Sequence, residues 1–200
     1  MSSREDAGKT KQLIVRTALL LVSEQGMSGL TAANLIKRAG ISKGGLYHHF
    51  KQMDEVAKAA LHLLIDEMLE QMTLEPAISV EHLLEHLERN VFRAFAGNPS
   101  QVKALYSFLA IAMFEQIYRQ EMKRFFEQLR VYLRANLHAF LGRKLSQDKL
   151  DAVVQVLCTQ VYGLAIHQYI HDEQENRNSW RAFRDSIHIL LANPQVSLSR

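Results

Sequence analysis

The chain has 200 residues, of which 48% are hydrophobic and 22% are charged, and its formal net charge is +3. The hydrophobic content excludes a chain that is disordered throughout, and no segment approaches the roughly 18 consecutive apolar residues of a membrane span. The single cysteine, Cys158, excludes a disulfide within the chain, which suits the reducing cytoplasm. We therefore expect a cytoplasmic protein with no membrane partner.

An all-α fold is predicted, because only three prolines occur and the apolar residues recur at spacings of three and four. The first helix covers about residues 9–25, after eight residues that are expected to be flexible. Thr31 is expected to cap a second helix, which stops at Gly40. Ser42 then caps a third, short helix over about residues 43–49.

A long helix is predicted to begin near residue 53 and to join the first three helices to the rest of the chain. Further helices are expected over about residues 79–96, 99–116, 117–142, 146–172 and 179–192. The breaks between them coincide with prolines, with glycine or with polar runs. No internal repeat or low-complexity segment interrupts this pattern.

The third helix, in the stretch GISKGGLYHHF (residues 40–50), predicts a helix-turn-helix. In such a unit the first helix braces against the DNA backbone and the second enters the major groove. Leu46 and Phe50 fall on the inner face, opposite Gly44 and His48. Two glycines destabilise a helix by about 1 kcal/mol each, but they allow close approach of the backbone to a surface. The alternative is a hairpin packed internally, with Tyr47 covered by the rest of the chain.

The distribution of charge also favours DNA binding by the N-terminal part. Residues 1–60 contain nine Lys and Arg against five Asp and Glu, whereas the remaining residues contain 15 basic and 16 acidic side chains. A basic excess on one part of a chain is typical of a nucleic-acid module joined to a neutral domain, although an ordinary solvated face can give the same count. The predicted DNA-binding residues are Thr31, Lys43, Gly44, Gly45, Tyr47, His48 and Lys51.

The segment LTAANLIKRAGISKGGLYHHFKQMDEVAKAAL (residues 30–61) resembles the N-terminal DNA-binding domain of TetR-family transcriptional regulators. The resemblance implies that Thr31 caps the second helix and meets a phosphate, and that Tyr47 and Lys51 hold the DNA backbone. It also implies that the groove faces Lys43, Gly44, Gly45 and His48. Family members usually have threonine where this chain has Gly45, so this chain lacks a hydroxyl on the reading face.

The resemblance further implies a division into a helix-turn-helix domain, residues 1–52, and a helical effector-binding and dimerisation domain, residues 53–200. The function expected is that of a homodimeric repressor, released from a palindromic double-stranded operator by a small apolar or amphipathic effector. The alternative is a DNA-binding adaptor whose C-terminal domain recruits a protein and binds no small molecule. An enzyme is not expected, because no phosphate-cradling glycine loop or nucleophile motif occurs, and no cofactor is expected.

Dimerisation is predicted from the last two helices. The helix over 146–172 is apolar on nearly all sides, and the final helix carries one apolar stripe. A partner subunit can cover such surfaces, and the alternative is that they form the core of a monomer. The predicted interface residues are Val153, Leu157, Val161, Trp180, Phe183, Ile187 and Leu190.

A ligand pocket is predicted from the large apolar side chains of the central helices, which are the usual lining of such cavities. The same residues at helical spacing can equally be ordinary core. The predicted ligand-binding residues are Phe92, Phe95, Tyr106, Phe108, Met113, Phe114, Phe125 and Tyr162.

Metal and redox chemistry are the remaining possibilities. Two groups of residues contain histidines at the i, i+4 spacing that can hold a metal. A third ligand is not identifiable, so no metal site is predicted. Cys158 lies in an apolar helix, where an inert buried thiol is favoured over a redox sensor. The residues with this spacing are His82, Glu85 and His86, and His167 and His171.

Overall fold

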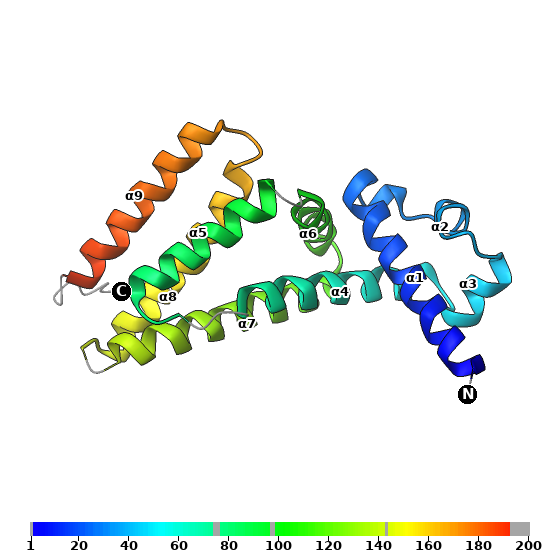
Figure 1. Ribbon diagram of the computed structural model, residues 1–200, viewed down its shortest axis with the longest axis horizontal. Coiled ribbons are helices and arrows are strands. Elements are labelled where there is room, and N and C mark those ends of the chain that lie inside the picture. Colours follow the sequence, from blue (N-terminus) through cyan, green and yellow to red (C-terminus); the bar gives the residue numbers. More distant parts are fainter. Residues whose placement is uncertain (1, 74–76, 97–98, 143, 193–200) are drawn as a thin grey trace. The chain divides into compact units, whose positions relative to one another are not determined.

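The computed structural model describes residues 2–73, 77–96, 99–142 and 144–192 (Figure 1). Within these ranges every regular element is a helix, which confirms the predicted fold class. The helices are α1 (Ser2–Gln25), α2 (Ala32–Ala39), α3 (Lys43–His49), α4 (Met53–Thr73), α5 (Val80–Ala96), α6 (Pro99–Ala112), α7 (Gln116–Leu141), α8 (Gln147–His167) and α9 (Glu173–Ala192), with a short 3-10 helix, η1 (Met27–Gly29).

Two helices begin earlier than the sequence predicted. α1 starts at Ser2, within the segment that was expected to be flexible. α9 starts at Glu173 because Asp172 and Glu175 form a capping box: the Glu175 N–H donates to Asp172 Oδ1 at 2.9 Å, and the Asp172 N–H donates to Glu175 Oε2 at 3.4 Å. Residues 173–178, which the sequence placed between two predicted helices, are therefore the first turns of α9.

The described helices pack as two compact units. Unit 1 contains α1 to α3, α4 as far as Glu70, α6, and α7 as far as Lys123. Unit 2 contains α5, α7 from Arg124 onward, α8 and α9. In this grouping α6 packs along α1 and so belongs with the first helices, whereas the predicted functional division after residue 52 stays a prediction.

Unit 1 is held together by apolar side chains from each of its helices. Ile14 and Ala18 of α1 are fully buried, and a hydrogen bond from Gln101 Nε2 to Glu67 Oε2, 3.2 Å long, joins α6 to α4. The core of unit 1 also contains Leu21, Val22, Leu35, Leu46, Phe50, Val56, Leu61, Leu64, Ala104, Phe108 and Tyr118.

Unit 2 has its core between α5, α7, α8 and α9, and α8 contributes the most to it. Among the described residues, only α8 has the length and apolar composition that a membrane span needs. Burial in the protein core accounts for this apolar composition, because seven side chains of α8 lie in the core of unit 2. They pack with residues such as Leu133 and Trp180. The seven are Leu150, Val153, Val154, Leu157, Cys158, Val161 and Leu164.

Candidate DNA-binding site

The first helix of the DNA-binding motif, α2, begins at a side-chain cap. Thr31 has extended backbone angles, and its Oγ1 accepts a hydrogen bond from the Asn34 N–H at 3.2 Å. The Asn34 side chain in turn donates to the carbonyl oxygen of Gly29 at 2.9 Å. The predicted cap is therefore confirmed, and the exposed Thr31 side chain lies at the positive end of the α2 dipole, where a phosphate is stabilised.

The turn between α2 and α3 depends on one glycine and one serine. Gly40 has φ of 65°, a left-handed conformation that glycine adopts without strain, and its N–H donates to the carbonyl oxygen of Ile36. Ser42 then caps α3, where its hydroxyl accepts a hydrogen bond from the Gly45 N–H at 2.9 Å. Both caps fall where the sequence placed them.

The two faces of α3 differ in exposure, as the helical pattern predicted. Leu46 is fully buried and Phe50 is nearly so, and together they fix the inner face of the helix. The side chain of Tyr47 is 41% exposed, and His48 is exposed beside it. Lys43, Gly44 and Lys51 are exposed and Gly45 is half-buried. The predicted reading face is therefore available for contact with DNA.

Gly44 and Gly45 differ in the space around them. A Cβ atom added at Gly44 would meet only Ser42 Oγ, at 3.9 Å, which is an ordinary van der Waals contact. At Gly45 the same atom would lie 3.3 Å from Ser42 Oγ, so the capping hydroxyl would have to shift. The absence of a side chain at Gly45 therefore avoids a close contact with the Ser42 hydroxyl that caps α3. At Gly44 the described residues leave room for a side chain.

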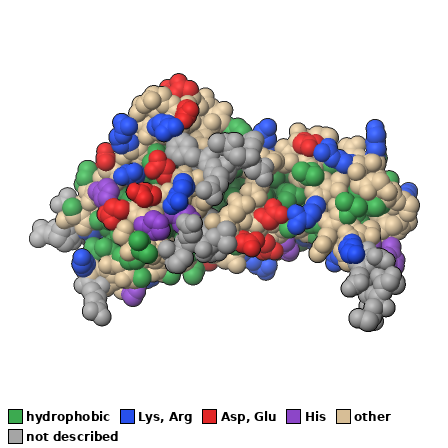
Figure 2. Space-filling model, viewed as in Figure 1, with side chains coloured by type: hydrophobic (Ala, Val, Ile, Leu, Met, Phe, Trp, Pro, Cys, Tyr) green, Lys and Arg blue, Asp and Glu red, His purple; other side chains and the backbone are tan. Residues whose placement is uncertain are grey.

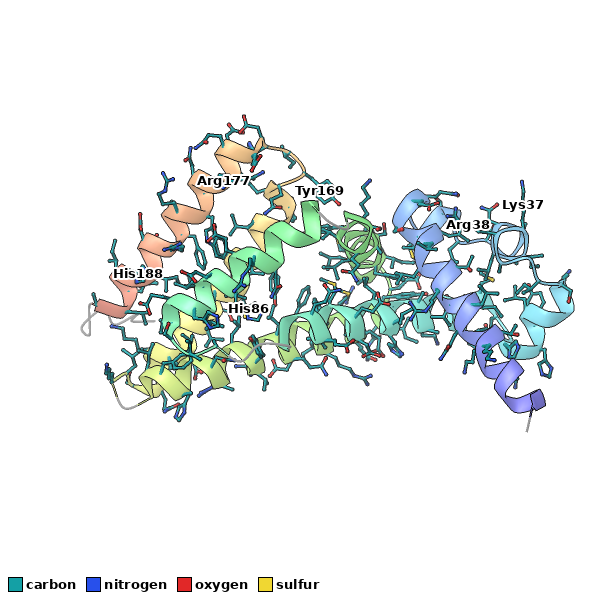
Figure 3. The ribbon with its side chains drawn as sticks, in the orientation of Figure 1. Lys37, Arg38, His86, Tyr169, Arg177 and His188 are labelled. Atoms are coloured by element: carbon teal, nitrogen blue, oxygen red, sulfur yellow. The ribbon has the colours of Figure 1, made fainter. Side chains whose placement is uncertain are left out.

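An ion pair between Arg38 and Glu24 joins α2 to α1. Arg38 makes a bidentate contact with Glu24, with N–O distances of 2.6 and 2.7 Å, and this geometry is the most directional that an arginine can form. Figure 3 shows Lys37 directed away from α2, whereas Arg38 lies between α2 and α1. On the face drawn in Figure 2, the Lys and Arg side chains of unit 1 are interspersed with acidic ones. The two neighbouring cations therefore have different surroundings: Arg38 is paired within the chain and Lys37 faces solvent.

Residues 14–60 match the family model of the bacterial regulatory proteins of the tetR family. These residues therefore form a DNA-binding domain of the TetR family. Its curated relatives include the transcriptional regulator PksA of Bacillus subtilis, 24% identical over 184 residues that cover 89% of this chain and 87% of PksA. The nucleoid occlusion factor SlmA of Vibrio campbellii is 26% identical over 82% of this chain and 83% of SlmA. The matched region spans the helix-turn-helix, so the caps and the reading face described above belong to a DNA-binding regulator.

Solved structures share the fold over nearly the whole chain. A transcriptional regulator from Rhodococcus sp. Rha1 matches with a TM-score of 0.77 at 19% identity, covering 94% of this chain and 98% of that one. A transcriptional regulator from Saccharomonospora viridis in complex with choline matches with a TM-score of 0.71 at 13% identity, covering 90% and 96%. At these identities the likeness shows the fold alone. The choline bound to the second protein therefore says nothing about the ligand of this chain.

The predicted ligand-binding residues of this TetR-family chain do not converge within either unit. The side chains of Phe92 and Phe95 lie outside the described residues. Met113 and Phe114, at the turn between α6 and α7, are 69% and 84% exposed, so they line no enclosed cavity. Tyr106 is half-buried in unit 1, Phe108 is buried there, and Phe125 and Tyr162 belong to unit 2. A common ligand site for these residues stays a prediction, and for Met113 and Phe114 the exposure argues against it.

An aromatic cluster forms in unit 2 around Tyr162. The ring of Tyr162 lies 4.5 Å from that of Phe126, which in turn lies 5.4 Å from Phe125, measured between ring centroids. Burial raises the pKa of Tyr162 far above its usual value, so its hydroxyl stays protonated and can donate. The cluster provides apolar surface together with a donor, but the structure places Phe125 itself in the core.

The predicted interface stripe is largely buried within the single chain. Trp180, Phe183 and Ile187 of α9 are at most 4% exposed in the single chain, where they pack in the core of unit 2. The predicted residues of α8, Val153, Leu157 and Val161, lie in the same core, and Leu190 packs against it. Because all of these side chains except the half-buried Leu190 are covered by their own chain, they offer little surface to a partner, and their part in a subunit contact stays a prediction. The exposed apolar side chains on α8 and α9 are others, among them Ile166 and Ile189.

A groove in unit 1 was not predicted from the sequence. It has a volume of about 190 Å³ and is lined by α1, α4 and α6. Arg16 Nη1 lies 3.4 Å from Glu67 Oε1 at its edge. Pockets for drug-sized ligands are typically about 300–1,000 Å³, so this groove would admit only a small molecule. The lining residues are Arg16, Leu19, Leu20, Ser23, Leu63, Glu67, Ser100 and Gln101.

The histidine pairs already use ring nitrogens in hydrogen bonds. His82 Nδ1 accepts from the Ile78 N–H at 3.3 Å, and His167 Nδ1 lies 2.8 Å from Asn176 Oδ1. In the part of the chain that the structure describes, no three His, Cys, Asp or Glu side chains are grouped so that they could hold a metal ion. These bonds give both pairs a structural role.

The Cys158 thiol is expected to be unreactive in the folded protein. It is buried in unit 2, and burial raises its pKa, so little of the nucleophilic thiolate is present near neutral pH. We expect an aromatic disulfide reagent at pH 8 to label folded protein about tenfold or more slowly than urea-unfolded protein. Equal rates in the two samples would show that the thiol is accessible and would reopen a redox role.

Proposed function

We propose that this chain is a homodimeric, cytoplasmic repressor that binds an inverted-repeat operator through α3 and is released by a small amphipathic effector. That it is a DNA-binding transcriptional regulator of the TetR family is established by the match to the family model and by its relatives. The observation that carries the proposal is the reading face of α3, where exposed Tyr47 and His48 follow two glycines, Gly44 and Gly45. This arrangement combines close approach of the backbone with side-chain donors.

TetR regulators dimerise, and a two-fold dimer presents two copies of α3. The operator should therefore be an inverted repeat whose half-sites are one or more helical turns apart. The contact between subunits is proposed to use the exposed apolar side chains of α8 and α9, among them Ile166 and Ile189. Unlike the buried stripe, these side chains remain available to a second copy.

Release by a small molecule is supported by solved structures of the same fold that hold small molecules, one of them choline. The alternative, a protein-recruiting adaptor, is kept because one relative is a nucleoid occlusion factor. Native mass spectrometry of the purified dimer separates the two. A bound small molecule that leaves on addition of operator DNA supports the effector, whereas an unliganded dimer that retains a protein partner supports the adaptor.

The DNA-binding part of the proposal is tested by selection from a randomised duplex pool with the purified protein. We expect an inverted repeat to be enriched. A reporter promoter that carries the selected repeat over its start site should be less active when the chain is present. Enrichment of no sequence would reject specific DNA recognition, and a rise in reporter activity would reject repression.

Lys51 and His48 are expected to act differently on the selected duplex. Lys51→Ala should weaken binding to selected and scrambled duplexes alike, because a phosphate contact carries no sequence information, and it should reduce the slope of log affinity against log salt by about one. His48→Ala should change the preference among half-site variants by roughly 5- to 150-fold, which corresponds to about 1–3 kcal/mol for one base contact. Fluorescence anisotropy at several salt concentrations measures both. Unchanged affinity and preference for His48→Ala would remove it from the reading face.

A further inference from the structure

One hydrogen bond in unit 1 joins two residues that are far apart in the sequence. Tyr118, at the start of α7, is 1% exposed, and its hydroxyl donates to Asp54 Oδ1 at 3.2 Å. The Tyr118 ring also packs on Phe108 of α6, with the centroids 6.2 Å apart and the planes 25° from parallel. The ring is therefore fixed by packing, and its hydroxyl is aimed at one acceptor.

The chemistry of the pair favours a persistent contact. At 3.2 Å the bond is longer than the roughly 2.5–3.0 Å of most O–H···O bonds, but a buried hydroxyl that lost this partner would remain desolvated and unpaired. Burial, followed by the negative charge of Asp54, raises the pKa of Tyr118 far above its usual value. The phenol therefore stays protonated at every working pH and remains a donor.

Asp54 lies immediately after the reading helix. It is in the first turn of α4, and only residues 50–52 separate α4 from the end of α3. These connecting residues have little freedom, because Phe50 is buried and the Lys51 N–H donates to Glu55 Oε2 at 2.8 Å. A displacement of the first turn of α4 would therefore be passed on to α3.

We infer that Tyr118 is a positioning residue for DNA recognition: by holding Asp54 it keeps the start of α4, and with it α3, in the arrangement that binds the operator. The inference rests on the proposed function and adds a residue outside the helix-turn-helix to it. α7 continues as one helix beyond Lys123 into unit 2. The contact thus joins the start of α4 to a helix that is shared by both units.

The test compares Tyr118→Phe with Tyr132→Phe on the duplex selected by the wild-type protein. Both changes remove a buried hydroxyl from α7, but the Tyr132 hydroxyl has no hydrogen-bond partner within the described residues. We expect Tyr118→Phe to weaken operator binding about 5- to 20-fold, as loss of one charge-assisted hydrogen bond allows. Tyr132→Phe should bind as the wild type does. Affinities are measured by anisotropy at 15 °C, and circular dichroism confirms that each variant is folded there.

A double-mutant cycle separates positioning from a general loss of stability. If Tyr118 acts through Asp54, then in an Asp54→Ala background Tyr118→Phe should cause no further loss of affinity. Wild-type or tighter binding by Tyr118→Phe, or an equal loss in both backgrounds, would overturn the inference. If the proposed function were wrong, the wild-type protein itself would select no duplex. That result can be told apart from the results for the Tyr118 variants.

Discussion

Ile187→Glu is expected to destabilise unit 2 strongly. Ile187 is fully buried between α9 and the rest of the core, where it packs with Trp180 and Phe183. A carboxylate at this position would be buried without a partner, at a cost of about 3–5 kcal/mol, against a total stability of about 5–15 kcal/mol. Differential scanning calorimetry should show a thermal midpoint lowered by roughly 10–20 °C, with loss of helical signal at a lower urea concentration.

Ile189→Glu is the matched control on the same helix. Ile189 is 61% exposed, and changes at exposed positions usually alter stability by less than about 0.5 kcal/mol. The variant should therefore lower the thermal midpoint far less than Ile187→Glu does. If Ile189 lies in the subunit contact, as proposed, light scattering should show more monomer than for the wild type. A folded Ile187→Glu variant with an unchanged midpoint would contradict the core described for unit 2.

The DNA-binding motif could be predicted in detail because its signals are local. Thr31, Gly40 and Ser42 each determine the backbone within three or four residues of themselves, through a cap or a left-handed turn. Leu46 and Phe50 could be placed on the inner face from helical spacing alone. Each of these expectations needed only a few consecutive residues.

The subunit contact could not be predicted in the same way. Helical spacing correctly identified the apolar stripe that contains Trp180 and Ile187, but it does not tell whether a stripe faces the same chain or a second one. That depends on which other helices pack against α9, and here the core of unit 2, including Leu133 of α7, covers the stripe. Long-range packing therefore decided the question.

The candidate ligand site shows the same limit. Met113 and Phe114 were expected inside because of their size, yet they lie in the turn between α6 and α7, where Arg119 donates to the carbonyl oxygens of Ala112 and Met113. These bonds satisfy the end of α6 and leave the two large side chains in solvent. Composition alone contains no information about such a turn.

The glycine at position 44 provides the sharpest test of close approach to DNA. Gly44→Ala should stabilise the free protein by about 0.5–1 kcal/mol, because alanine favours the helix and its methyl group would meet nothing nearer than 3.9 Å. The same methyl group would stand between α3 and the groove floor. We therefore expect a thermal midpoint about 2–4 °C higher together with operator binding at least tenfold weaker, a loss of about 1.4 kcal/mol.

Gly163→Ala separates these two effects. Gly163 lies in α8, is exposed, and has no atom within 4 Å of an added Cβ, so alanine there should raise the midpoint by a similar amount. Because Gly163 belongs to unit 2 and not to the helix-turn-helix, operator affinity should stay at the wild-type value, with light scattering used to confirm an unchanged oligomeric state. If Gly44→Ala also bound the selected duplex as tightly as the wild type, the backbone of α3 would not approach the DNA closely, and the two glycines would need another explanation.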